Sequence, residues 1–306
     1  AELAKKENID AVIGLGGGSS MDQAKATAAL ATNGGRCRDW DNTDLENKML
    51  TTICIPTTAG TGSEATFVAV ITDTERKYKM SLFDPKNLAP DIAIIDPELT
   101  VSMPPALTAS TGIDALTHAI EAYTSKVANP ITDSMALYAI ELIAGNIVNA
   151  VQNGNDLVAR ENMMIASLMG GIAFINSNVG AVHAISETIG AWYDAPHGVC
   201  NSIFLPYVFE YNIQANPRKH ARISKLMGVN ALGKTQEEVA LDGVKAIKKL
   251  CEDINIPKLR DVDGISESNF RKIAIASADN FLSNDNARPI GVEGYLTILE
   301  QAYNEK

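Results

Sequence analysis

The stretch AVIGLGGGSSMDQAK, residues 11–25, decides the fold of the first part of the chain. A short apolar run, Ala11–Leu15, ends in three glycines and is followed by a helical segment from Ser20 to about Ala31. Strand, glycine turn and helix in this order open a βαβ unit with parallel strand pairing. The glycines let a ligand approach the backbone, and the helix N-terminus favours a phosphate. An ordinary glycine-rich loop is the alternative, because the spacing is not G-x-G-x-x-G.

Further strand-like segments follow as far as Asp96. TTICIP (51–56) is a second buried run, and DIAIID (91–96) predicts a last strand before Pro97. TFVAVITD (66–73) and YKMSLF (78–83) flank a polar turn at residues 74–77 and predict a hairpin.

The chain changes character near Met103. After Pro104 and Pro105, helical periodicity runs through residues 106–126, 132–152, 159–174, 236–253, 267–280 and 292–303. We therefore expect an α/β domain over residues 1–103 and an all-helical domain over residues 104–306. The cleft between the two domains is the expected functional site.

Composition excludes several classes of protein. A net charge of −11 argues against nucleic acid and anionic membranes as partners. The sequence lacks an uninterrupted apolar run of about 18 residues, so we expect no membrane span.

The four cysteines (Cys37, Cys54, Cys200 and Cys251) have no paired spacing, which predicts reduced thiols and a cytoplasmic location. The chain opens on AELAKKENID, without an initiator Met, and we expect an N-terminal segment to be missing.

Two pairs of residues predict a metal site. Asp114 and His118 lie four residues apart in TGIDALTHAIEAY, so a helix places them on one face. His183 and His197 bracket HAISETIGAWYDAPH, a short helix and loop that can bring a second pair to the same point. One carboxylate and three imidazoles suit iron(II) or zinc and leave room for an exogenous ligand. Either pair alone is more typical of a surface contact or a satisfied side chain, so the prediction depends on their combination.

Two remaining polar residues near these motifs receive simpler interpretations. Glu121 follows His118 on the same helix, and we expect it to support a ligand or form a salt bridge rather than bind metal. His220, in the polar stretch NPRKHARISK, is expected to be a solvated helix residue.

A second loop, PTTAGTGSEAT (56–66), also follows a buried strand. Its hydroxyls and glycines are compatible with an ordinary turn. Two such loops on one parallel sheet would, however, lie side by side at the carboxyl edge, where dinucleotides bind.

Four longer motifs together resemble the iron-containing (group III) alcohol dehydrogenase family. They are GGGSSMDQAK (16–25), TTAGTGSEAT (57–66), DPELTVSMPPALTASTGIDALTHAIEAY (96–123) and HAISETIGAWYDAPHGVCNSIFLP (183–206), in the family's order. The resemblance covers residues 9 to about 211. It implies a Rossmann-like dinucleotide-binding α/β domain followed by an all-α metal-binding domain, the dehydroquinate synthase-like architecture.

The resemblance also assigns roles to individual residues. It implies that the metal ligands are Asp114, His118, His183 and His197, and that the diphosphate and ribose loop is formed by Gly16, Gly17, Gly18, Ser19 and Asp22. It places Thr57, Thr58, Thr61 and Thr66 on the second cofactor loop and Lys79 near the cofactor's ribose. The implied cofactors are iron(II), with zinc as the alternative, and NAD or NADP. We also expect a homo-oligomer, a dimer or larger.

The chain departs from the family pattern in three places. Glu187 stands where family members commonly have a histidine near the nicotinamide; it could replace that histidine as a proton relay, or turn outward and pair with a basic side chain. The family's segment ahead of residue 1, which helps to choose between NAD and NADP, is absent. NDNARPI (284–290) replaces an Asn-Pro-Arg pattern, so no role is transferred there.

The predicted function is hydride transfer between a small primary alcohol or diol, or its aldehyde, and NAD(P). A lyase of the dehydroquinate-synthase type is one alternative, but it would favour a basic phosphate-binding cluster near the metal, and HAISETIGAWYDAPHG has none. A non-catalytic helical assembly module is the other alternative; it accounts for the helices but not for the four ligands.

Overall fold

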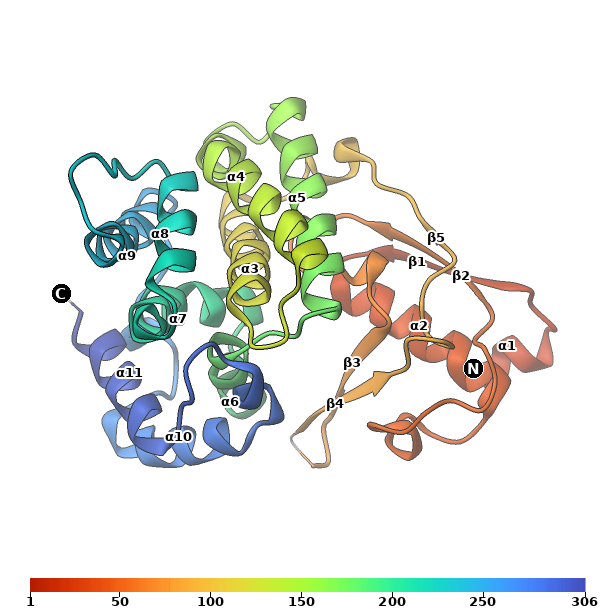
Figure 1. The fold of residues 1–306 in the computed structure, drawn as a ribbon. Helices are drawn as coiled ribbons and strands as arrows, with labels where there is room; N and C mark the ends of the chain where they lie inside the picture. Colours follow the sequence, from red (N-terminus) through yellow and green to blue (C-terminus); the bar gives the residue numbers. More distant parts are fainter. Residues whose placement is uncertain (77, 306) are drawn as a thin grey trace.

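The first part of the chain is a small α/β unit (Figure 1). A computed structural model describes residues 1–76 and 78–305, so Lys77, at the end of the predicted polar turn, and Lys306 lie outside the described residues. A short helix, α1 (Glu2–Lys6), precedes β1 (Ala11–Gly16), α2 (Gly18–Asn33), β2 (Thr51–Pro56) and β5 (Ile92–Ala93). The strands form a parallel sheet in the order β1-β2-β5, and α2 packs on β1 and β2. The predicted βαβ opening is confirmed.

The predicted hairpin is also confirmed. β3 (Val68–Asp73) pairs in antiparallel fashion with β4 (Tyr78–Phe83), with Val70 opposite Ser81. The strand predicted at residues 91–96 is much shorter than expected, because only Ile92 and Ala93 pair with β2. The amide of Ile94 still donates to the carbonyl of Cys54 at 2.9 Å. The backbone then leaves the sheet and enters a short 3-10 helix at Pro97, and Asp96 caps the start of this helix through the amide of Glu98.

The second part consists of helices (Figure 1). They are α3 (Pro105–Thr124), α4 (Pro130–Gln152), α5 (Leu157–Ile175), α6 (Ala181–Tyr193), α7 (His197–Asn212), α8 (Pro217–Leu226), α9 (Gln236–Asp253), α10 (Phe270–Asp279) and α11 (Val292–Asn304). Capping residues in the sequence mark where several of these helices begin. Asn129 caps α4 ahead of Pro130, and Thr235 and Glu238 form a capping box at α9. The expected all-helical second part is confirmed.

Two hydrophobic cores match this division. One joins α2 to the hairpin and to the loops around Leu45 and Leu88, and the other fills the helical part from Ala109 to Ala302. Among the described residues every strand precedes α3. On this basis we propose the predicted boundary near Met103 as the domain boundary.

The two parts meet where a glycine loop touches α5. Gly62 has a left-handed φ of 61°, and a Cβ there would lie 2.5 Å from the Cα of Gly171. Only glycine at both positions permits this backbone contact. The contact seats the second candidate cofactor loop directly on the helical part, so the loop and the helices share one cleft.

Helices α4 and α5 are long and apolar enough to cross a membrane by length and composition, with mean hydropathies of 1.4 and 1.2. The sequence expectation of no such segment considered uninterrupted apolar runs and missed these averages. Both helices pack against each other and against α3. Apolar core helices of globular proteins satisfy the same criterion.

Candidate metal centre and cofactor cleft

Three helices bring three of the four predicted metal ligands together. Asp114 lies in the middle of α3, His183 in the first turn of α6, and His197 at the start of α7. One ligand atom from each lies within 4.8 Å of the other two. Oδ1 of Asp114 is 3.9 Å from Nε2 of His183 and 3.8 Å from Nε2 of His197. These separations suit atoms that share a metal ion at about 2.0–2.2 Å each.

The fourth predicted ligand, His118, lies beside this group rather than within it. Its ring stacks between Phe174, at a centroid distance of 4.3 Å, and His183, at 4.6 Å. Its Nδ1 faces the carbonyl oxygen of Gly60 at 3.3 Å. This contact leaves Nε2 as the atom with which His118 can bind a metal.

The pKa shifts of the candidate ligands favour the forms that bind a cation. Burial lowers the pKa of His118 to about 4 and that of His197 to about 3, so both rings keep free lone pairs at neutral pH. Burial alone would raise the pKa of Asp114, but the neighbouring histidines and a hydrogen bond from Asn201 lower it overall. An ionised carboxylate beside neutral imidazoles fits a divalent metal such as iron(II) or zinc.

Glu121 supports His183, as expected from the sequence. The carboxylate is buried, and its Oε1 accepts a hydrogen bond from the backbone amide of Val182 at 2.7 Å. Its Oε2 lies 2.6 Å from Nδ1 of His183. Burial would lower the pKa of His183, but this hydrogen bond and the charge of Glu121 raise it overall. A carboxylate on Nδ1 directs Nε2 toward Asp114, which is the usual support for a metal-binding histidine.

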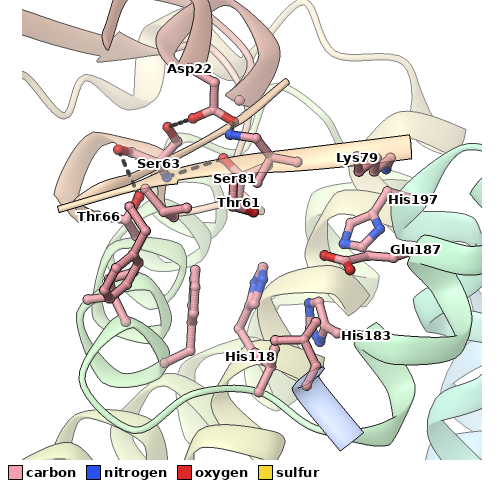
Figure 2. A pocket seen from close by; sticks show the side chains of 18 of the residues that line it. Asp22, Thr61, Ser63, Thr66, Lys79, Ser81, His118, His183, Glu187 and His197 are labelled. Atoms are coloured by element: carbon pink, nitrogen blue, oxygen red, sulfur yellow. Dashed lines mark hydrogen bonds between the residues drawn. The ribbon is translucent and has the colours of Figure 1, made fainter. Parts of the chain in front are cut away.

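A cleft of about 480 Å³ joins these residues to the glycine loop. Figure 2 shows His118, His183, His197 and Glu187 in one part of the cleft, and Asp22, Thr61, Ser63 and Thr66 in another. Of the predicted cofactor residues, those that line the cleft are Gly18, Ser19, Asp22, Thr61, Thr66 and Lys79. Gly16, Gly17, Thr57 and Thr58 lie outside this lining, at the ends of β1 and β2.

The two predicted cofactor loops are neighbours at the carboxyl edge of the sheet. The amide of Thr57 donates to the carbonyl of Gly16 at 2.9 Å. A Cβ at Gly18 would lie 2.7 Å from Cγ2 of Thr61, so the loops approach as closely as a glycine allows. α2 starts at Gly18, and its first two residues, Gly18 and Ser19, line the cleft. This arrangement suits a pyrophosphate.

Asp22 and Thr66 also hold the scaffold together. The carboxylate of Asp22 accepts from Oγ of Ser63 at 2.6 Å and from the amide of Val70 at 3.2 Å. Lys25, fully buried, donates to the carbonyl of Val68 at 2.7 Å and to Oγ1 of Thr66 at 3.1 Å. Sequence reasoning missed Lys25, because its one signal is an ordinary lysine in a helix.

Glu187 and Lys79 lie at the metal end of the cleft (Figure 2). Oε2 of Glu187 accepts a hydrogen bond from the side chain of Asn280 at 3.0 Å. The positive charge of Lys79 reaches His197 and contributes to lowering its pKa. The cleft lining also contains the apolar residues Phe174, Ile175, Val179, Phe281 and Leu282, together with the polar Asn178.

A glycine-rich loop at the carboxyl edge of a parallel sheet and a set of metal donors facing one cleft fit the class of metal-dependent and dinucleotide-dependent enzymes. The comparisons with known proteins agree. A family model for iron-containing alcohol dehydrogenase matches residues 1–97, and one for the C-terminal part of the Fe-containing alcohol dehydrogenase family matches residues 108–303.

Relatives of known name cover almost the whole chain. An NAD-dependent methanol dehydrogenase of Bacillus methanolicus is 40% identical over 98% of this chain and 79% of its own length. A 1,3-propanediol dehydrogenase of Klebsiella pneumoniae is 43% identical over 98% of this chain and 77% of its own length. The crystal structure of a 1,3-propanediol oxidoreductase superposes with a TM-score of 0.95 at 41% identity, covering 99% of this chain and 79% of that one.

The chain belongs to the iron-containing alcohol dehydrogenase family. The predicted reaction class, a metal-dependent alcohol dehydrogenase acting on CH–OH groups, is confirmed. The lyase and the assembly module, kept as alternatives from the sequence, find no support among these relatives.

Proposed function

We propose that the chain interconverts a small primary alcohol or diol and its aldehyde, using NAD and iron(II) held in the cleft. The main support for this proposal is that one cleft is lined both by Gly18 and Ser19 of the glycine loop and by the metal donors Asp114, His183 and His197. A bound divalent cation would polarise the oxygen of the alcohol or aldehyde, and a bound nicotinamide would exchange the hydride.

The proposed metal ligands are Asp114, His183 and His197, joined by His118. The first three already converge. Nδ1 of His118 faces Gly60, so Nε2 is the atom that we propose joins the set. Iron(II) is proposed from the family, and zinc, which takes the same ligand types, is the alternative.

For the cofactor, we propose that Gly16, Gly17, Gly18 and Ser19 receive the pyrophosphate through their backbone amides. Thr57, Thr58, Thr61 and Thr66 would line the neighbouring loop, and Asp22 and Lys79 would contact the riboses. NAD rather than NADP is supported by the printed name of the methanol dehydrogenase relative. It is also supported by the position of Lys79, the one cation among the described lining residues, at the metal end of the cleft.

The apolar walls support a substrate with a short, uncharged chain. Phe174 and Phe281 line the same cleft as the metal donors, and an alkyl chain would bury its surface there at about 25 cal/mol per Å². The relatives named for methanol and 1,3-propanediol point to the same size range.

Glu187 is proposed as the group that exchanges the substrate's proton. It lines the cleft and is held by Asn280 rather than by a cation among the described residues. A carboxylate so placed can accept a proton directly or through one water. We further propose a cytoplasmic location without nucleic-acid or membrane partners, supported by the acidic composition and the unpaired cysteines. A homo-oligomer is proposed from the sequence expectation alone.

The test is reconstitution. Purified protein is stripped with a chelator, loaded anaerobically with iron(II) or zinc, and assayed for NADH or NADPH oxidation with propanal and 3-hydroxypropanal. We expect metal-dependent turnover that is faster with NADH. Binding of NADH and metal without turnover of any small aldehyde would contradict the proposed substrate class.

A further inference from the structure

Asn201 lies at the centre of the candidate metal site, although no sequence motif singled it out. It follows His197 by one helical turn on α7 and is fully buried. Its Nδ2 donates to Oδ1 of Asp114 at 2.6 Å. The same nitrogen lies 3.2 Å from Nε2 of His183 and 3.1 Å from Nε2 of His197. One amide nitrogen therefore touches all three converging ligand atoms.

The chemistry of the amide restricts the hydrogen-bond roles of these ligand atoms. An amide nitrogen donates two hydrogens and does not accept. One hydrogen goes to Asp114, and the other goes to one ring nitrogen or is shared between the two, so a ring nitrogen that bonds to it must be an unprotonated acceptor. The opposite orientation would place the amide oxygen 2.6 Å from an ionised carboxylate oxygen, which is repulsive. Asn201 thus favours the ionised form of Asp114 and the imidazole tautomers with a lone pair on Nε2, which are the forms that bind a metal.

His197 depends on this contact more than His183 does. Glu121 holds Nδ1 of His183, whereas Nδ1 of His197 is buried with no hydrogen-bond partner among the described residues. Asn201 is the polar side chain that orients the ring of His197. Oδ1 of Asn201 is likewise buried without a partner, so nothing on that side competes for the amide.

We propose that Asn201 is a positioning residue of the metal centre. It gathers Asp114, His183 and His197 around one point and holds the carboxylate turned toward them. Because its Nδ2 lies close to the point that the three ligand atoms share, the amide would have to shift away from a bound cation, and the hydrogen bond to Asp114 is the contact that it would keep. The inference rests on the metal site of the proposed function.

The test compares two variants on the same helix. Asn201→Leu keeps the number of side-chain heavy atoms and the branched shape but removes the amide. Asn212→Leu is the matched control, because Asn212 is also a buried asparagine of α7 and pairs with Asn286 at 2.9 Å. Zinc affinity is measured by competition with a chromophoric chelator. Cobalt(II) absorption reports the coordination geometry.

We expect Asn201→Leu to weaken zinc binding by about 10–100-fold, as removal of a ligand's hydrogen-bond partner does, and to change the cobalt spectrum. Asn212→Leu should lower the melting temperature and leave both metal readouts at the wild-type values. Wild-type zinc affinity and an unchanged cobalt spectrum in a folded Asn201→Leu would overturn the positioning role alone. Failure of the wild-type protein to bind zinc or cobalt would instead overturn the metal site.

A second measurement does not depend on the folding of a variant. In a crystal structure of the wild-type protein with zinc bound, Nδ2 of Asn201 should stay within hydrogen-bond distance of Asp114, at about 2.7–3.2 Å. A separation beyond about 4 Å would overturn the proposal, because no hydrogen bond then holds the carboxylate.

Discussion

Oε2 of Glu121 lies 2.6 Å from Nδ1 of His183, although 62 residues separate the two along the chain. The contact joins α3 to α6 inside the helical core, where both side chains are buried. The same carboxylate accepts the amide of Val182 at the start of α6. Glu121 therefore sets both the position of the α6 N-terminus and the ring orientation of the proposed ligand.

Glu121→Gln should weaken metal binding. A glutamine has one acceptor oxygen, so it cannot satisfy both the Val182 amide and the His183 ring, and its own NH₂ opposes one of these donors. We expect zinc affinity to fall by about 10-fold or more, as for other partners of metal-binding histidines. Chelator competition measures it, with exposed Glu161→Gln on α5 as the control. Equal affinities in the two variants would refute the supporting role.

Gly17→Val should abolish coenzyme binding and spare the metal. A Cβ at Gly17 meets only Thr58, at an ordinary 3.5 Å, so the fold tolerates the β-carbon. The methyl groups that branch from this Cβ would crowd the gap between the two loops and displace the Gly17 amide, which is one of the proposed pyrophosphate donors. NADH fluorescence titration and metal analysis are the readouts. Gly145→Ala, where a Cβ meets nothing within 4 Å, is the control. If Gly17→Val retained the wild-type affinity for NADH, the glycine loop would have a structural role and would not bind the coenzyme.

Glu187→Gln tests the proton relay. The amide preserves size and the contact with Asn280 but cannot accept the proton, so alcohol oxidation should slow by about 10-fold or more, since general acid–base groups contribute 10²–10⁴-fold. Metal content should not change. The measurement is the oxidation rate of metal-loaded enzyme between pH 6 and 9. An unchanged rate over that whole range would eliminate Glu187 as the relay.

Asp84 should make stability depend on pH. Burial alone would raise its pKa, but amides of Lys86, Asn87 and Leu45 donate to the carboxylate and lower the pKa overall. A pKa below that of the unfolded chain means that the carboxylate stabilises the fold above about pH 4, and that this stability is lost as the pH falls through the folded pKa.

Asp84→Asn should therefore cost about 1–3 kcal/mol at pH 7. The difference from wild type should shrink as the pH falls from about 4 toward the folded pKa, because the wild-type carboxyl is progressively protonated there. Urea unfolding at several pH values measures this, with exposed Asp263→Asn as the control. A difference that does not change with pH would show that the charge of Asp84 contributes nothing.

Short-range patterns predicted most of the secondary structure. The apolar run and glycines at residues 11–18, the alternation in the hairpin, and the helical periods after Pro105 all act within a few residues of the chain. The long motifs around Asp114 and His183 indicated the family because they too are contiguous stretches that can be read from the sequence alone. Predictions failed where the local pattern was weak or misleading, as at β5, where the chain leaves the sheet after Ala93. They also failed at His220, whose polar neighbours predicted solvent exposure but which is 1% exposed beneath Phe209.

The sequence by itself determined most of the elements that form, and from it came the proposals for the phosphate loops and the metal donors. Only the tertiary structure decided how those donors meet: Asp114, His183 and His197 converge, whereas His118 stacks between Phe174 and His183. It also decided which buried residues support them, since Glu121 and Asn201 touch ligands 62 and 87 residues away in the chain. Such contacts depend on how α3, α6 and α7 pack against one another, and packing is set by the whole core rather than by any local period.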